Sequence, residues 1–241
     1  MHVLHIRILT SCTSKKAVSH PSQLTGEDFD AGGPHLQQRK QHIEDVALPA
    51  GEMYTGQQHQ HLMRGVNHLR RVRPDASVEV GIISAGLGLV MENEPIVPYE
   101  RTFSGRSKRE IIDLASSLQV PVDARRFLKS PADLSLLLLG TSYLTALRPD
   151  DSLAFGGPTL AFAGREGISM LPDHPHLKKV TVTQEAAKRF SQGLVWLKGF
   201  LARRLLKAIA QDPTVMEQVL HPDTDVLSFL EGQDRQVSLG L

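Results

Sequence analysis

The chain has 241 residues, a hydrophobic content of 41 % and a formal net charge of +1, so it is long and apolar enough to form a sizeable core. No stretch approaches about 18 consecutive apolar residues, and the amino-terminal segment lacks a signal-peptide pattern, so we expect neither a membrane-spanning helix nor a secreted protein. A single cysteine excludes an internal disulfide bond and fits a reducing, cytoplasmic compartment.

A buried strand is predicted at residues 2–11, where aliphatic and β-branched side chains are dense. A second is predicted at residues 77–85, where the apolar run after Glu79 indicates burial on both faces. A third buried strand is predicted within residues 132–147; it ends at Gly140 and leads into a turn or short helix. Shorter strand candidates follow in the second half of the chain: residues 153–157, 159–164 and 178–183.

Helices are predicted between and after these strands. A Gly- and Asp-rich stretch at residues 26–34 is typical of a loop, and a polar helix is expected at residues 36–45. Apolar side chains recur at helical spacing in residues 57–71 and 108–118. The clearest helix covers residues 185–210, where one apolar stripe consists of Phe190, Leu194, Leu197, Leu201 and Leu205.

Strands that alternate with helices predict an α/β fold, a three-layer sandwich around a central, mainly parallel sheet. Such sheets bind ligands at the carboxyl ends of their strands, where the loops gather. We therefore expect residues 1–183 to form an α/β core that carries the functional site, and residues 184–241 to form a helical extension packed on it.

Three loops leave the carboxyl ends of the predicted strands. The first, TSCTSKK (residues 10–16), offers hydroxyl and backbone N–H groups that can hold an anion, and two lysines that add charge. The second, SAGLGLV (84–90), has two glycines that allow close approach of a ligand or simply a tight turn. The third, GTSYL (140–144), carries a tyrosine that can stack on a base or pack on the sheet.

Two further segments place a carboxylate near a tyrosine. The segment AGEMYTG carries Glu52 and Tyr54 just ahead of a predicted helix, where they can form a cap or a site. The segment PIVPYERTF carries Tyr99 and Glu100 in a loop that two prolines stiffen. A stiff loop suits a catalytic carboxylate, because such a group must hold its position.

No metal site and no cofactor is predicted. The histidines occur as the pairs His2/His5, His59/His61 and His174/His176, without carboxylates or cysteine in a familiar zinc spacing. Cys12 follows a strand, but the sequence places no histidine as the base that a thiol nucleophile needs.

The charges are unevenly placed along the chain. Residues 185–210 contain six Lys or Arg and one acid, whereas residues 211–241 contain six acids and one Arg. This pattern is typical of a solvated basic helix face followed by an acidic tail, or of a surface for an anionic partner such as nucleic acid.

Four segments in this order resemble the motifs of the YaaA-like superfamily: SCTSKK, EMYTG, ISAGLGLVMENEPIVPYERTF and LGTSYLTAL, over residues 8–147. A typical member reads Ser-Cys-x-x-Lys-Lys, Leu-Tyr-Thr-Gly, Leu-Ser-Ala-x-Tyr-Gly-Leu-Val, Pro-Tyr-Glu and Gly-x-x-Tyr. Leu87 stands where many members have tyrosine, so a stacking partner is missing or supplied elsewhere. The resemblance implies a fold like that of uracil-DNA glycosylases, together with DNA binding and protection from DNA damage.

The resemblance and the strand-end groups favour a DNA glycosylase that excises a modified base, for example a glucosylated one, in defence against phages. The reaction needs an extruded nucleotide and a stabilised oxocarbenium-like sugar, a task for Glu100 or Glu52. The predicted substrate contacts are Ser11, Cys12, Thr13, Lys15, Tyr54, Thr55, Ser84, Gly86, Gly88, Tyr99 and Tyr143. The predicted contacts with the DNA backbone are Lys16, Arg203, Arg204 and Lys207.

Two other functions fit the same residues. A non-catalytic DNA-binding, stress-protection protein would use the basic groups and would not depend on Glu100 or Glu52. An enzyme acting on free nucleosides or nucleotides would keep the strand-end pocket but would need no basic track. Charge reversal at Arg203 and Arg204 separates the two, because it harms only the DNA-acting proteins.

Overall fold

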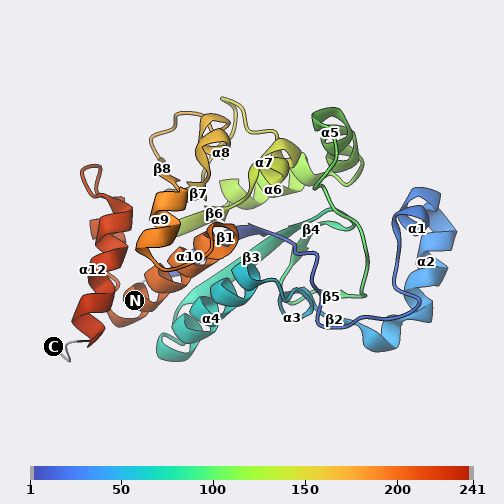
Figure 1. The fold of residues 1–241 in the computed structure, drawn as a ribbon, viewed down its shortest axis with the longest axis horizontal. Coiled ribbons are helices and arrows are strands. Elements are labelled where there is room, and N and C mark those ends of the chain that lie inside the picture. Colours follow the sequence, from blue (N-terminus) through green and yellow to red (C-terminus); the bar gives the residue numbers. More distant parts are fainter. Residues whose placement is uncertain (1–2, 239–241) are drawn as a thin grey trace.

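A six-stranded sheet forms the middle layer of the computed structural model, which describes the backbone of residues 3–238 and the side chains of residues 3–233 (Figure 1). The strand order is β4-β3-β1-β6-β7-β8, and all neighbours are parallel except β3 and β4. This confirms the predicted three-layer α/β sandwich with a mainly parallel sheet. The strands are β1 (His5–Ser11), β3 (Ser77–Ser84), β4 (Gly88–Met91), β6 (Leu134–Leu138), β7 (Thr159–Ala163) and β8 (Leu177–Thr181).

Helices cover both faces of this sheet (Figure 1). One face carries α4 (Gln57–Val72), α9 (Gln184–Arg189), α10 (Leu194–Gln211), α11 (Val215–Leu220) and α12 (Val226–Ser238). The other face carries α5 (Lys108–Ser117), α6 (Val120–Lys129), α7 (Thr141–Leu147) and α8 (Arg165–Ser169). Alternate residues of a strand point to opposite layers: Leu136 packs with α4 and α10, and Leu137 packs with α5 to α7. The long apolar runs of the strands follow from this two-sided burial.

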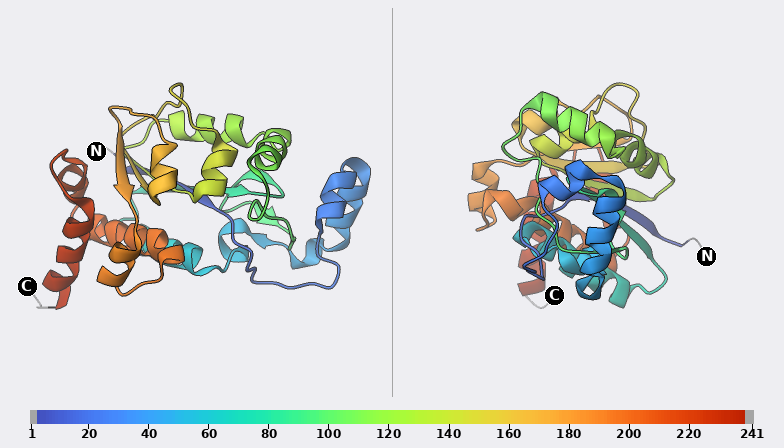
Figure 2. Two further views of the ribbon diagram at one scale, coloured as in Figure 1. Left: turned by 45° about the horizontal axis from the view of Figure 1, so that its top comes forward. Right: turned by 90° about the vertical axis from the view of Figure 1, so that its right-hand side faces the viewer.

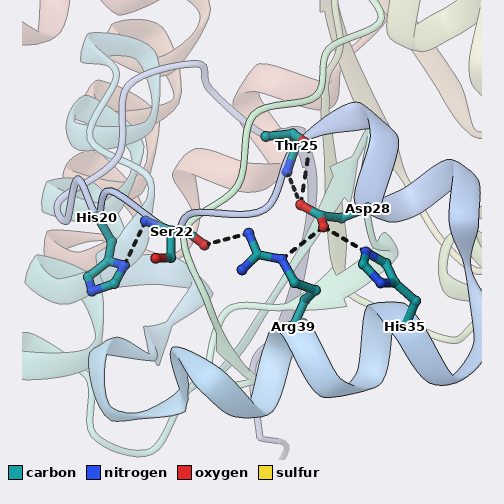
Figure 3. A network of polar contacts seen from close by, with 6 residues as sticks. All are labelled: His20, Ser22, Thr25, Asp28, His35 and Arg39. Atoms are coloured by element: carbon teal, nitrogen blue, oxygen red, sulfur yellow. Dashed lines mark hydrogen bonds and ion pairs between the residues drawn. The ribbon is translucent and has the colours of Figure 1, made fainter.

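A small helical hairpin stands away from the sheet (Figure 2), and consists of α1 (Gly26–Ala31) and α2 (Gly33–His42). The buried carboxylate of Asp28 holds it together by accepting hydrogen bonds from the Thr25 backbone N–H at 2.8 Å and from Arg39 Nε at 2.9 Å (Figure 3). These hydrogen bonds keep the pKa of Asp28 well below its usual range, the bond from Arg39 most of all. The hairpin leads through η1 (Glu44–Val46) to β2 (Leu48–Pro49), which pairs with β5 (Pro95–Ile96), and to α3 (Ala50–Met53).

Three sequence predictions about elements are wrong. Residues 26–34 are not a loop, because Thr25 and Asp28 cap the helix α1. Residues 153–157 are not a strand: their backbone packs against residues 130–132, where a Cβ on Gly157 would stand 2.0 Å from the Ala132 carbonyl oxygen. The helix predicted at 185–210 is two helices, α9 and α10, because the chain turns at Ser191, which has a φ of 51°.

The structure also contains elements that the pattern did not indicate, chiefly α6 and the antiparallel edge strand β4. Residues 1–2 and 239–241 of the predicted core and extension lie outside the described residues. Along residues 3–238, no helix combines the length and the apolar character that a membrane span requires.

The helices α4 and α10 approach each other closely because glycines face the contact. A Cβ on Gly199 would stand 2.0 Å from the Gln58 carbonyl oxygen, and a Cβ on Gly65 would stand 2.7 Å from the Arg203 Cα. The apolar side chains of both helices share one core with the sheet, for example Leu62 on α4 and Leu201 on α10. Residues after 184 therefore complete the cover of this face of the sheet.

We expect Gly199→Ala to destabilise the fold by about 3 kcal/mol, because the new methyl group meets backbone that cannot move without separating the two helices. Gly232→Ala on α12 is the matched control, since no atom lies within 4 Å of its Cβ position. In a helix this change is expected to be neutral or to stabilise by up to about 1 kcal/mol. Urea denaturation measures both, and equal stability of the two variants would contradict the close approach.

Candidate functional site

The candidate site lies where the carboxyl ends of β1 and β6 meet. After β1 the chain turns toward the layer of α4, and after β6 it enters α7 in the opposite layer, so the two loops diverge and leave a crevice. Two cavities open there, of about 300 Å³ and 430 Å³. We call them the base cavity and the side cavity, and together the strand-end cleft. Their shared lining is Cys12, Thr13, Ser14, Thr102 and Tyr143.

Cys12 and Tyr143 form the wall between the two diverging loops. The Cys12 Sγ and the Tyr143 hydroxyl are 3.1 Å apart and share a hydrogen bond. Burial raises the pKa of Tyr143 well above its usual range, so its hydroxyl keeps its proton. Tyr143 is half-buried and lines both cavities, which leaves part of its ring available to a ligand.

Lys16 brings a positive charge into the base cavity. Residues 15–17 pair with residues 53–55 in antiparallel fashion, since the Thr55 N–H donates to the Lys15 carbonyl and the Ala17 N–H donates to the Met53 carbonyl. The Lys16 Nζ donates to the Thr13 carbonyl at 3.0 Å and lies 4.3 Å from the centre of the Tyr99 ring.

Burial lowers the pKa of Lys16, while the nearby Cys12 and Glu100 act in the opposite direction. Of the two lysines in the loop, Lys16 lines the cleft, and Lys15 is exposed outside it.

Beneath the cleft, three hydroxyl groups form a buried chain. The Tyr99 hydroxyl lies 2.7 Å from the Tyr54 hydroxyl and 2.7 Å from Ser84 Oγ. Ser84 Oγ accepts hydrogen bonds from the backbone N–H groups of Gly86 and Leu87, so its own proton is donated to Tyr99, and the Tyr99 proton goes to Tyr54. Tyr54 and Tyr99 are only 1 % and 2 % exposed. Their rings therefore form the floor of the site, and Tyr143 is better placed to stack on a base.

Glu100 is held at the mouth of the base cavity. The Leu24 N–H donates to the Pro98 carbonyl at 3.1 Å, and the Glu100 N–H donates to the Leu24 carbonyl at 2.7 Å, so this loop is fixed by pairing as well as by proline. Among the side chains of residues 3–233, Glu100 is the one carboxylate that lines either cavity of the cleft. Glu52 lines a separate cavity of about 630 Å³, beside Arg70 and Glu92. The structure thus separates the two carboxylates.

The remaining predicted substrate contacts divide into cleft residues and packing residues. Ser11 lines the side cavity, and the Thr13 hydroxyl accepts from the Gly56 N–H at 3.2 Å, at the start of α4. A Cβ on Gly86 would meet the Phe29 and Tyr99 rings at 2.9 and 3.1 Å, and Gly88, with a φ of 79°, packs against Leu118. Packing accounts for both glycines. Thr55 pairs with Lys15, and its hydroxyl is buried without a partner.

The basic residues predicted on α10 lie away from the cleft. The α10 residues that line the side cavity are Val195 and Trp196, at its amino-terminal end. The Arg204 guanidinium lies over the Phe190 and Phe200 rings and donates to the Leu230 carbonyl of α12 at 3.1 Å. Arg204 therefore joins two helices, whereas Lys207 is exposed.

Two cations at the strand ends were not found from the sequence. Arg101 lines the base cavity, lies 5.2 Å from the Phe29 ring and pairs with Asp30, which ties the α1–α2 hairpin to the cleft. Arg101 directly follows Glu100 in the stiff loop, and this position could have indicated from the sequence that it lies near the cleft. The Lys198 Nζ lies 3.7 Å from where a Cβ on Gly140 would stand, and burial lowers its pKa to about 8. Its spacing from Leu194 places it at the edge of the apolar stripe.

The described residues contain no group of three or more His, Cys, Asp or Glu side chains arranged to hold a metal ion. No protein-family model matches the chain, and a search of curated proteins found no match.

We expect the three tyrosines of the chain, all of which line or floor the cleft, to stay protonated in the folded protein at a pH where free tyrosine ionises, about pH 10. The unfolded chain loses these protons and the folded chain keeps them, so stability falls as the pH rises above about 10. Near-ultraviolet absorbance follows the titration, with the urea-unfolded protein as control. A tyrosine that ionises near pH 10 in the folded protein would contradict the buried hydroxyl chain.

We expect Lys198→Met to be more stable than the natural protein at neutral pH, because the buried ammonium has no partner among the described residues. From pH 8 to 10.5 the folded protein holds Lys198 mostly neutral, whereas the unfolded chain still binds the proton. The free energy of unfolding of the natural protein therefore rises across this pH range, and the stability advantage of Lys198→Met becomes smaller. Urea denaturation at several pH values tests this, and a difference that stays constant with pH would contradict the burial of the amine.

Proposed function

We propose that the protein is a DNA glycosylase, which excises a modified nucleobase from DNA and leaves an abasic site, in defence against phages with modified bases. The observation that carries the proposal is that a carboxylate and an ammonium group lie in the same cavity, the base cavity. One carboxylate, Glu100, and one partly buried ammonium, Lys16, line the same space and interact electrostatically. The fold supports this reading, because ligands of parallel α/β sheets bind at the carboxyl ends of the strands.

These two groups suit the hydrolysis of an N-glycosidic bond. The bond between C1′ and the base nitrogen breaks, its electron pair leaves with the base, and the oxygen of a water molecule bonds to C1′. Glu100 stabilises the positive charge on the sugar or takes the proton of the attacking water. Lys16 donates a hydrogen bond or its proton to the departing base, a role that its lowered pKa favours.

The shape of the cleft favours a base that carries a substituent. The base cavity of about 300 Å³ would take the extruded base against Tyr143. The side cavity of about 430 Å³ shares that wall and would take the substituent. Its lining includes the amide side chains of Gln57 and Gln58 and the ring of Trp196, which suit a polar group such as a sugar.

The first experiment measures base release from phage DNA with glucosylated bases and from unmodified DNA. Glu100→Gln is expected to lower the rate of release by at least about 100-fold, the loss typical of a missing acid–base group. Glu52→Gln is the matched control, because it makes the same change at an exposed glutamate of a separate cavity, and it should keep the activity.

Three other results would contradict the proposal. Full activity of Glu100→Gln would remove the carboxylate from the mechanism. DNA binding without release of any base would favour the non-catalytic DNA-binding protein. Release of bases from free nucleosides, with none from DNA, would favour an enzyme that acts on small molecules.

A further inference from the structure

A second set of basic residues lies on the outer side of the packed helices α4 and α10. On α4, the side chains of residues 61, 64, 68 and 71 recur at steps of three, four and three, so they share one helix face. On α10, residues 203 and 207 lie one turn apart. We call this set the α4–α10 basic face; it consists of His61, Arg64, His68, Arg71, Arg203 and Lys207.

Contacts and charge effects join the two helices into one face. Gly65 lets α10 approach so closely that a Cβ there would stand 2.7 Å from the Arg203 Cα. After the effect of burial, the charges of Arg203 and Arg64 lower the pKa of His61. In the same way, Lys207 and Arg71 lower the pKa of His68, one to two turns further along the two helices. Cations of both helices therefore act on each histidine.

The four Arg and Lys residues of the face form no ion pair with a carboxylate among the side chains of residues 3–233. No carboxylate oxygen of residues 3–233 lies within the 4.0 Å ion-pair distance of Arg64, Arg71, Arg203 or Lys207. The Nε of Arg203 is also buried without a hydrogen-bond partner. Arg70, which is next to Arg71 on α4, does form an ion pair, with Glu92. Like charges held together destabilise a fold, so their grouping points to an anion outside the chain.

The face leads away from the strand-end cleft. Gln57 and Gln58 at the start of α4, and Val195 and Trp196 at the start of α10, line the side cavity. From Gln57 to Arg71 the helix α4 rises by about 21 Å. This length matches roughly six steps of a DNA strand at 3.4 Å for each step. A strand whose nucleotide enters the cleft would then pass along the basic face.

We propose that the α4–α10 basic face binds the sugar–phosphate backbone of the DNA strand whose base enters the strand-end cleft. The inference rests on the proposed function for the identity of the partner. It replaces Arg204 of the sequence prediction with residues of α4, because Arg204 is directed toward α12. Phosphate contacts carry little sequence preference, so the face would hold modified and unmodified DNA alike.

The test measures the affinity of the full-length protein for unmodified DNA at several salt concentrations. The triple variant Arg64→Gln, Arg71→Gln and Lys207→Gln changes three exposed residues of the face. The logarithm of the binding constant decreases with the logarithm of the salt concentration, and each lost phosphate contact should reduce the steepness of this decrease by about 0.9. The triple variant should therefore show a slope that is less steep by about 2 to 3. The matched control is Arg109→Gln, Arg126→Gln and Lys129→Gln on α5 and α6, which removes the same charge from exposed sites on the opposite side of the sheet.

Thermal unfolding first shows that both variants are folded. A less steep salt dependence of DNA affinity in the α4–α10 variant alone supports the inference. Equal losses in the two variants, no loss in either, or no DNA binding by the natural protein would overturn it. Base release with unchanged salt dependence would overturn the inference and leave the glycosylase standing. A changed salt dependence without base release would leave the inference standing and remove the glycosylase.

Discussion

The hydrogen bond between the Tyr54 and Tyr99 hydroxyl groups is the constraint on which the strand-end cleft depends. It joins the segment after α3 to the loop after β5, and Ser84 ties both to the end of β3. Lys16 pairs with Tyr54 through the backbone, and its amine lies on the Tyr99 ring. The cation in the base cavity and the loop that carries Glu100 are therefore held by the same buried rings. Loss of one hydroxyl would leave a buried partner unsatisfied, at a cost of about 1–3 kcal/mol.

The protein uses positive charge in two physically different ways. Burial makes the ammonium groups of Lys16 and Lys198 costly, so their pKa values fall and they give up a proton more easily. Such groups suit chemistry in an enclosed space. Arg64, Arg71 and Lys207 are exposed to water, where salt weakens the attraction between their side chains and anions. They suit reversible contact with a long, charged partner.

Sequence position was a partial guide to the candidate site. The hydroxyl- and lysine-containing loop after β1, and the stiff loop with Glu100, were predicted because strand ends and prolines are visible in the chain. Glu52 has a similar neighbourhood in the sequence: a tyrosine lies two residues after it, whereas a tyrosine directly precedes Glu100. It nevertheless lines another cavity, because the α3 turn directs the Tyr54 side chain into the core and leaves Glu52 exposed on a different side. A tyrosine beside an acid is thus not enough to define a site.

The sequence by itself determined the buried strands of the sheet, β1, β3, β6 and β7, because strands covered on both faces are apolar at nearly every position, and that pattern is local. It also determined the loops at the carboxyl ends of β1 and β3, where the predicted strands stop. Only the tertiary structure decided which side chains meet. Helix α10 begins after the turn at Ser191, and Lys198 reaches Gly140 through contacts between segments far apart in the chain. Periodicity reports whether a residue is buried, whereas its partner depends on how distant elements pack, and no local pattern contains that information.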